Sequence, residues 1–220
     1  MGVNLLVKLW YYSYSLFFCL RYLPFKQATV VPILIWPSSK ILNLKRGDIV
    51  LTGKIQRKTV LLGFEGAKCR SSRSFEICIE NGGALHLGNG INIARGTRIV
   101  ANGGVIRVGD GFFCNGDCMF AANQDITIAD NVLFGWNIEL NTTNGHATFC
   151  NGVENEMSGP IKIDNHVWVC SDCIIGRGVT IAENVVVARR SFVTSNIQKS
   201  NCLYGGTPAK LIKEDFTWKH

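Results

Sequence analysis

Residues 161–196, IKIDNHVWVCSDCIIGRGVTIAENVVVARRSFVTSN, carry an apolar residue at every sixth position. These six anchors are Ile163, Val169, Ile175, Ile181, Val187 and Val193. An amphipathic α-helix would repeat about every 3.6 residues, so a strict period of six excludes a helix here. The stretch is therefore a run of six-residue repeats, and such repeats indicate an architecture built by stacking.

The same period extends upstream through the middle of the chain. Nine further anchors are Leu87, Ile93, Ile99, Val108, Cys114, Phe120, Ile128, Phe134 and Leu140. Three residues after each of the fifteen anchors comes a corner position, and twelve of these corners are Gly, Asn or Asp. Such residues tolerate a left-handed backbone conformation, so each hexad is predicted to be a short strand that ends in a tight corner.

Three hexads are predicted to form one triangular coil. Stacked coils would bury a continuous aliphatic ladder and pair with one another as parallel strands. Degenerate coils are expected before Leu87, because the pattern persists weakly around Gly47 and Gly53.

Several interruptions break the repeat. Extra residues near Val105–Arg107 and Asp125–Thr127 are expected to bulge at corners. The largest interruption lies between Thr143 and Ile161. A loop of that length in a regular solenoid is uncommon without a function.

Length and composition fit one well-buried unit of 220 residues with an N-terminal appendage. The formal charge of +7 suits an anionic partner. No zinc-finger, RRM or helix-turn-helix pattern accompanies the charge, so nucleic acid is not expected as a partner. The nine cysteines are scattered and no signal peptide is recognised, which favours reduced thiols in a cytosolic protein.

The segment from Leu5 to Leu23 is rich in Leu, Trp, Tyr and Phe and also carries Lys8 and Arg21. It is marginal for a membrane span, which needs about 20 predominantly apolar residues. A helix that packs on its own domain and a helix in the membrane interface both stay open, and Trp, Tyr and flanking cations support the second. The protein is predicted to be cytoplasmic, with peripheral contact to the cytoplasmic face of the inner membrane left open.

The repeat resembles that of the hexapeptide-repeat acyltransferases over residues 85–213. Three stretches resemble the branch of galactoside, maltose and polysaccharide O-acetyltransferases: NVLFGWNIELNTTNGHATF (131–149), GPIKIDNHVWVCSDCIIGRGVTIAENVVVARRSFVT (159–194) and GGTPAKLIK (205–213). The resemblance implies an all-β fold, a left-handed parallel β-helix, here with an N-terminal helix and a short C-terminal extension. The expected parts are a helical lead-in (1–40), the β-helix with an extruded loop at about 144–160 (41–200) and a CoA-proximal tail (201–220).

The same resemblance implies an acetyl-CoA-dependent O-acetyltransferase that works as a homotrimer without a metal. Its expected acceptor is a sugar hydroxyl of a bacterial surface polysaccharide, meaning capsule, O-antigen or exopolysaccharide, or of a precursor. Acetylation of a free sugar, serine or antibiotic stays open, as does a non-catalytic scaffold. A zinc hydratase similar to the γ-type carbonic anhydrases would need three histidine ligands, which four scattered histidines hardly supply.

His146 follows Gly145 at the start of the long interruption, outside the anchor series. Imidazole can accept a hydroxyl proton near neutral pH, and the family's catalytic histidine falls at this place. His146 is therefore predicted to be the general base. His166 occupies a corner position, where histidine is tolerated at positive φ, and is predicted to be structural.

The resemblance also suggests the donor site. Its CoA-binding residues are expected to be Trp168, Ser171, Arg189, Gly205, Gly206, Pro208, Lys210 and Lys213. The amide of Ser171 is expected to hold the oxyanion, and the two lysines are expected to meet phosphate. Trp168 could instead merely cover a strand. Arg189 and Arg190 replace small residues usual in the sugar branch, so the CoA wall differs or gains a phosphate contact.

The acceptor side is expected to involve Asn115, Asn123 and Asn141, although Asn123 is also a corner residue. Acidic side chains at 139, 154 and 156 stay open as alternatives. A cysteine nucleophile is the chemical rival, since a thiolate also attacks thioesters. Cys114, Cys118 and Cys173 fall on inward positions, where a thiol acts as a small hydrophobic group. Cys170 and Cys173 form a Cys-x-x-Cys motif. Cys170 follows an anchor and points differently from Cys173, so metal binding or redox chemistry by this pair is not expected.

Overall fold

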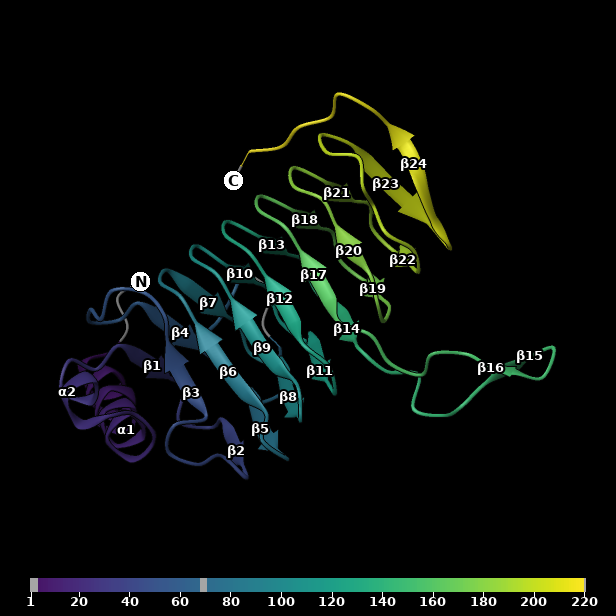
Figure 1. Ribbon diagram of the computed structural model, residues 1–220. Helices are drawn as coiled ribbons and strands as arrows, with labels where there is room; N and C mark the ends of the chain where they lie inside the picture. Colours follow the sequence, from purple (N-terminus) through teal and green to yellow (C-terminus); the bar gives the residue numbers. More distant parts are fainter. Residues whose placement is uncertain (1–3, 68–70, 220) are drawn as a thin grey trace.

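The hexads form three parallel sheets that wind into a solenoid, shown by the computed structural model for residues 4–67 and 71–219 (Figure 1). The nine-stranded sheet contains β1 (Ile33–Ile35), β4 (Val60–Leu62), β7 (Ile91–Ile93), β10 (Phe113–Cys114), β13 (Leu133–Phe134), β18 (Trp168–Val169), β21 (Val186–Val187), β23 (Leu203–Gly206) and β24 (Ala209–Lys213). The seven-stranded sheet contains β2 (Lys40–Leu42), β5 (Glu76–Glu80), β8 (Arg98–Asn102), β11 (Met119–Ala122), β14 (Glu139–Asn141), β19 (Ile174–Ile175) and β22 (Phe192–Val193). The six-stranded sheet contains β3 (Ile49–Leu51), β6 (Ala84–Leu87), β9 (Val105–Val108), β12 (Ile126–Ile128), β17 (Ile161–Ile163) and β20 (Thr180–Ile181).

Each strand of these sheets pairs in parallel with the equivalent strand of the next coil, except that β23 and β24 form an antiparallel pair at the C-terminal end. The predicted left-handed parallel β-helix, with its N-terminal helix and C-terminal extension, is confirmed. Strands β1 to β5 of the first coils lie before Leu87, where the sequence pattern is weak.

The core is the predicted ladder of anchors. All fifteen anchor side chains are at most 3% exposed. Phe112, Phe120 and Phe134 pack against one another in the middle of the solenoid, with ring centroids 5.1 to 6.3 Å apart. Aromatic contacts of this kind contribute about 0.5–1.5 kcal/mol each beyond burial, so this region is a stable centre of the fold.

Eleven of the fifteen corner residues have a positive φ, as predicted. The four without it are Asn102, Asn123, Thr143 and Asn196. All four follow strands of the seven-stranded sheet, at the corners that lead to the six-stranded sheet. We call this row of corners the arm edge. Bulges were expected near Val105–Arg107 and Asp125–Thr127, but strands β9 and β12 occupy most of those residues. The extra residues lie slightly earlier, in the arm-edge corners that precede β9 and β12.

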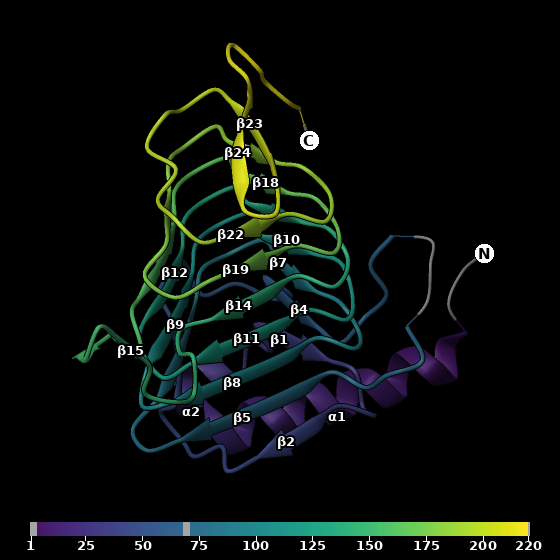
Figure 2. The same ribbon diagram turned by 90° about the vertical axis from the view of Figure 1, so that its right-hand side faces the viewer.

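Helix α1 (Leu5–Tyr22), followed by the short α2 (Phe25–Ala28), lies across the open end of the first coil (Figure 2). The Ser15 hydroxyl accepts a hydrogen bond from the Ile35 amide at 3.0 Å, and the Cys19 thiol donates to the Ile33 carbonyl at 3.4 Å. Phe18 and Cys19 are buried. One face of α1 therefore closes the N-terminal end of the core.

Candidate active site

A groove of about 400 Å³ lies where strands of the nine-stranded sheet turn toward the seven-stranded sheet. We call this row of corners the groove edge. The residues that line the groove are Asn115, Leu133, Gly135, Trp136, Trp168, Cys170, Ser171 and Arg189. Four residues predicted for the site, Asn115, Trp168, Ser171 and Arg189, thus come together although they span 75 positions of the chain.

Glycine at position 135 allows a close approach to the backbone of Ser171. A Cβ atom on Gly135 would lie 2.6 Å from the Ser171 amide nitrogen and 2.6 Å from its hydroxyl. That hydroxyl accepts a hydrogen bond from the Trp136 amide at 3.0 Å, which ties the two coils together. Because Gly135 has no side chain, its backbone can lie directly against the Ser171 backbone of the next coil.

Arg189 forms the rim of the groove together with Asp172. The Asp172 carboxylate accepts hydrogen bonds from Arg189 Nε at 2.9 Å and Asn137 Nδ2 at 3.0 Å, and its second contact with the guanidinium is 2.8 Å. The Asn137 hydrogen bond, and next the Arg189 contact, lower the pKa of Asp172. The Arg189 side chain is therefore 67% exposed at the groove, while the Asp172 carboxylate orients its guanidinium group.

Trp168 has contacts on two sides. It lines the groove and also packs at 45° on Trp218, with ring centroids 5.8 Å apart. Trp218 stacks on His166 at 4.4 Å and donates from Nε1 to the His166 carbonyl at 3.0 Å. His166 has a φ of +55° and pairs through Nδ1 with Asn184 Oδ1 at 2.9 Å, which confirms that it occupies a corner.

The C-terminal residues predicted to contact CoA lie one coil beyond Arg189. A Cβ atom on Gly205 would lie 2.8 Å from the Cβ of Ala188, so the two coils approach closely there. Gly206 donates from its amide to the Ser191 hydroxyl at 3.1 Å. Lys210 and Lys213 are exposed on β24, with Lys210 opposite Gly205, while Pro208 lies in the turn between the strands. None of these residues lines the groove itself.

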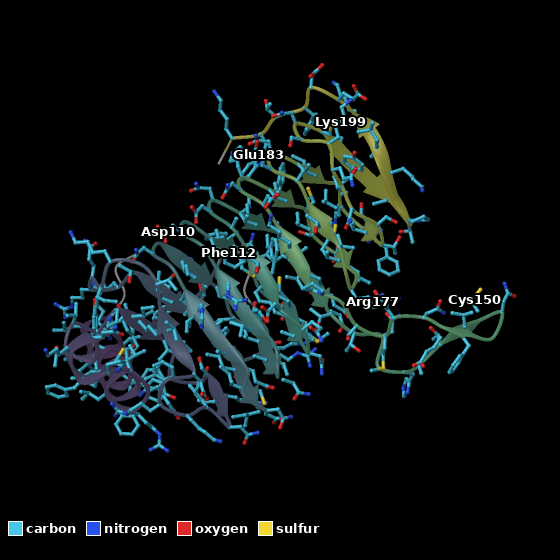
Figure 3. The ribbon with its side chains drawn as sticks, in the orientation of Figure 1. Asp110, Phe112, Cys150, Arg177, Glu183 and Lys199 are labelled. Carbon is cyan, nitrogen blue, oxygen red and sulfur yellow. The ribbon has the colours of Figure 1, made fainter. Side chains whose placement is uncertain are left out.

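His146 lies on a projecting arm, residues 144–157, in which every residue is exposed. Its far end is the hairpin of β15 (Phe149–Cys150) and β16 (Val153–Glu154), and Cys150 marks its tip in Figure 3. The Asn144 amide donates to the Met157 carbonyl at 2.9 Å and closes the base of the arm. The arm leaves from the arm edge, so a single chain does not bring His146 into its own groove.

The three asparagines predicted for the acceptor all have structural hydrogen bonds. Asn115 accepts from the Ala67 amide at 3.0 Å and donates to the Phe134 carbonyl at 3.3 Å. Asn141 accepts from the Thr143 amide at 3.2 Å and shapes the base of the arm. The backbone N–H of Asn123 donates to the Thr142 hydroxyl at 2.8 Å. Asn123 does not have a positive φ, so the prediction that it forms a left-handed corner was wrong. Of the three, only Asn115 lines the groove.

The thiols near the groove are poor nucleophiles. Burial raises the pKa of Cys170 to about 11 and also raises the pKa of Cys173. Because the thiolate is the reactive form, both side chains stay protonated near neutral pH. Within residues 4–67 and 71–219, no three His, Cys, Asp or Glu side chains gather as they would around a metal ion.

Leu133, Gly135 and Trp136 also line the groove and were not among the predicted residues. The repeat pattern could have identified these three lining residues, because they lie within two positions of an anchor in the nine-stranded sheet, as Asn115 and Ser171 do. Comparing every third hexad would have placed them on one edge. Trp218 has no such signal, because it belongs to the tail after the repeat.

Comparison with known proteins supports a classification from both sequence and fold. A galactoside O-acetyltransferase from Escherichia coli (strain K12) is 38% identical over 114 residues, which cover 51% of this chain and 55% of that protein. A maltose O-acetyltransferase from Clostridium difficile 630 is 30% identical, with 64% of this chain and 68% of that chain covered and a TM-score of 0.44. A polysialic acid O-acetyltransferase is 20% identical, covers 86% of this chain and 87% of that chain, and has a TM-score of 0.60.

The last of these likenesses, at 20% identity, concerns the fold alone. The sequence identities of 38% and 30% show that the chain belongs to the hexapeptide-repeat acyltransferases, in the branch of the galactoside and maltose O-acetyltransferases. No family model matches the sequence. The chain spans about half the length of the curated relatives it matches.

Proposed function

We propose that the protein is an acetyl-CoA-dependent O-acetyltransferase that modifies a sugar hydroxyl of a bacterial surface polysaccharide or its precursor. The observation that carries the proposal is the division of the site between two edges: a groove with Ser171, Trp168 and Arg189 on one, and an exposed His146 arm on the next. The names of the relatives, a galactoside and a polysialic acid O-acetyltransferase, support a sugar acceptor.

The proposal includes a homotrimer, because one chain does not complete the site. The arm exposes Phe149 by 65% and Val153 by 69%, and apolar side chains at such a place favour contact with a second copy. An arm that docks beside the neighbour's groove is a heterologous contact, and such contacts form a ring when the rotation between subunits closes, as a threefold rotation does. Three copies would thus give three sites, each with His146 from one subunit and the groove from the next.

The groove and its rim suit acetyl-CoA. Gly135 leaves the floor of the groove without a side chain, and Trp168 offers an aromatic wall. Lys210 and Lys213 supply exposed ammonium groups beyond the rim, where they can pair with phosphate oxygens. Arg189 adds a third cation at the rim, although Asp172 neutralises part of its charge.

The reaction proposed is direct transfer. His146 takes the proton of the acceptor hydroxyl as its oxygen attacks the thioester carbonyl. The Ser171 amide donates to the oxyanion that develops there. When the carbon–sulfur bond breaks, the imidazolium returns the proton to the leaving thiolate. The products are an acetylated sugar and free CoA.

Complementation between two inactive variants tests this division of the site. His146→Ala removes the base, and Cys170→Trp fills the groove with a bulky side chain. Each variant alone should be inactive toward acetyl-CoA with galactosides or polysialic acid as acceptors. Co-expressed chains that assemble at random should recover about a quarter of wild-type activity, because one interface in four pairs an intact arm with an intact groove. No recovery from mixed, folded trimers would place base and groove in the same chain and overturn the proposal.

A further inference from the structure

The face of α1 that points away from the β-helix is mostly apolar, with Ser13 as an exposed polar residue near its middle. Its side chains recur at helical spacing and are exposed by 72% at Leu6, 56% at Leu9, 54% at Trp10, 39% at Leu16 and 62% at Phe17. In the adjoining α2, Phe25 is exposed by 70%. A surface helix normally turns polar residues toward water, so this helix shows the reverse of the usual pattern.

The opposite face of the same helix is firmly packed, which holds the outer face in place. Ser15, Phe18 and Cys19 are buried against the first coil. On the outer face, Trp10 is also held, because it rests edge-on against Trp36 with ring centroids 5.9 Å apart and planes at 80°. The exposed apolar residues therefore lie on a fixed helix at the end of the solenoid (Figure 2).

Charge identifies the kind of partner that this face fits. The first 47 residues contain six Lys or Arg and no Asp or Glu, so they carry six of the seven net positive charges of the chain. Arg57 and Lys58 lie over the Tyr12 ring, at 5.4 and 4.9 Å, and add two cations beside α1. Two copies meeting end to end would bring like charges together, whereas an anionic surface would neutralise them.

We propose that α1 docks flat on an anionic lipid surface through Leu6, Leu9, Trp10, Leu16, Phe17 and Phe25. Amphipathic helices bind such interfaces by burying an apolar face while basic residues meet the headgroups. Lys8 and Arg21 lie on the same helix, and Lys26 follows it. In the part of the chain that the structure describes, no helix is long and apolar enough to cross a bilayer, so the helix lies on the surface.

This placement has a consequence for the acceptor, which rests on the function proposed above. Neighbouring parallel strands are about 4.8 Å apart, and β18 lies five coils from β1, so the groove is about 24 Å above the first coil. Helix α1 adds its own diameter of about 10 Å. A β-helix standing on α1 would hold the groove about 30 Å from the lipid. Sugars several units along a lipid-anchored glycan could reach the groove at that height, whereas the first sugar of the glycan could not.

Flotation with lipid vesicles tests the docking without any need for activity. Wild-type protein should float with phosphatidylglycerol-containing vesicles, and much less with pure phosphatidylcholine or at high salt. Leu16→Gln with Phe17→Gln should weaken this binding at least about tenfold, because two apolar side chains no longer enter the interface. The melting temperature should not change, since both side chains are exposed.

The matched control is Leu211→Gln with Ile212→Gln, two exposed apolar residues on β24 at the far end of the solenoid. It should float like the wild type. Wild-type protein that stays unbound with anionic vesicles overturns the proposal, as does equal flotation of the two double variants. A doubled assembly mass in light scattering that Leu16→Gln with Phe17→Gln abolishes would assign the face to a second copy instead.

Discussion

The groove edge and the arm edge are built from the same hexads but differ in regularity. From β7 to β22, every connection along the groove edge contains four residues, and the corner residue has positive φ. Along the arm edge the connections vary, and the one between β14 and β17 holds nineteen residues. The regular edge presents backbone groups such as the Ser171 amide at fixed positions, while the variable edge can extend a side chain far from the body.

This difference assigns separate tasks to the two edges. Hydrogen bonds between coils restrain the groove edge, as when Trp136 donates to the Ser171 hydroxyl. The arm is held by hydrogen bonds at its base, between Asn144 and Met157, and by its own hairpin. Changes on the arm should therefore affect catalysis and assembly, and changes beneath the groove should affect stability.

The largest effect is expected at His146. His146→Ala should lower turnover by about 10²–10⁴-fold, the usual loss when a general base is removed. The melting temperature and acetyl-CoA binding should stay close to wild type, since His146 is exposed on the arm. Steady-state kinetics with an acceptor that the wild type uses, together with thermal unfolding, measure both.

His166→Asn is the matched control, because asparagine tolerates positive φ at this corner and should retain most activity. A result that implicates the Cys170 and Cys173 thiols would contradict the role of His146. If His146→Ala turns over normally while Cys170→Ser with Cys173→Ala is dead, an acyl-thiol intermediate replaces the general-base mechanism.

Two phenylalanines, one beneath the groove edge and one on the arm, should respond differently to truncation. Phe134 is fully buried beneath the groove edge, and Phe134→Ala should cost about 3–5 kcal/mol of unfolding free energy through lost burial and a cavity. Phe149 is 65% exposed on the arm, so Phe149→Ala should change the unfolding free energy of a dilute, dissociated chain by less than about 0.5 kcal/mol.

Urea unfolding below the dissociation concentration measures the free energies of both variants, and light scattering measures their assembly. Phe149→Ala should weaken association while Phe134→Ala acts on the fold. Equal losses of monomer stability would show that the arm is an integral part of the core, and the contrast between the two edges would disappear.

Much of the fold could be predicted because its rules are local. An anchor every six residues and a Gly, Asn or Asp three residues later define the strands and corners, and even His166 obeys them. The site was partly predictable, because the resemblance named Trp168, Ser171 and Arg189, and all three lie within two positions of anchors of one sheet and line the same groove.

The rest depends on contacts between segments that share no repeat. Trp218 covers His166 from a tail fifty-two positions away. Asn115 is held by Ala67 across forty-eight positions, which a hexad pattern does not encode. The apolar composition of α1 was visible, but which face is exposed follows from how Phe18 and Cys19 enter the first coil.

The smallest expected effect concerns the charge at the groove rim. Hydrogen bonding to Asn137 and the Arg189 contact lower the pKa of Asp172 in the folded chain. Its stabilising contribution is therefore present above the pKa of an unfolded Asp, about 3.9, and is lost as the pH falls through the lower folded value. Asp172→Asn keeps a residue that tolerates the φ of +63°.

At pH 7 the wild type should exceed Asp172→Asn in stability by about 1 kcal/mol or less, because the Arg189 side chain is 67% exposed and water screens the pair. The difference should shrink as the pH falls toward 3, and urea midpoints at pH 7, 5 and 3 measure it. Asp125→Asn supplies the comparison at the arm edge, where hydrogen bonding from the Val105 amide, and then the Arg107 contact, lower the pKa of Asp125. The difference in unfolding free energy between the wild type and Asp172→Asn could instead stay constant down to pH 3. That result would mean that the geometry of this corner, and not the charge at the rim, stabilises the groove edge.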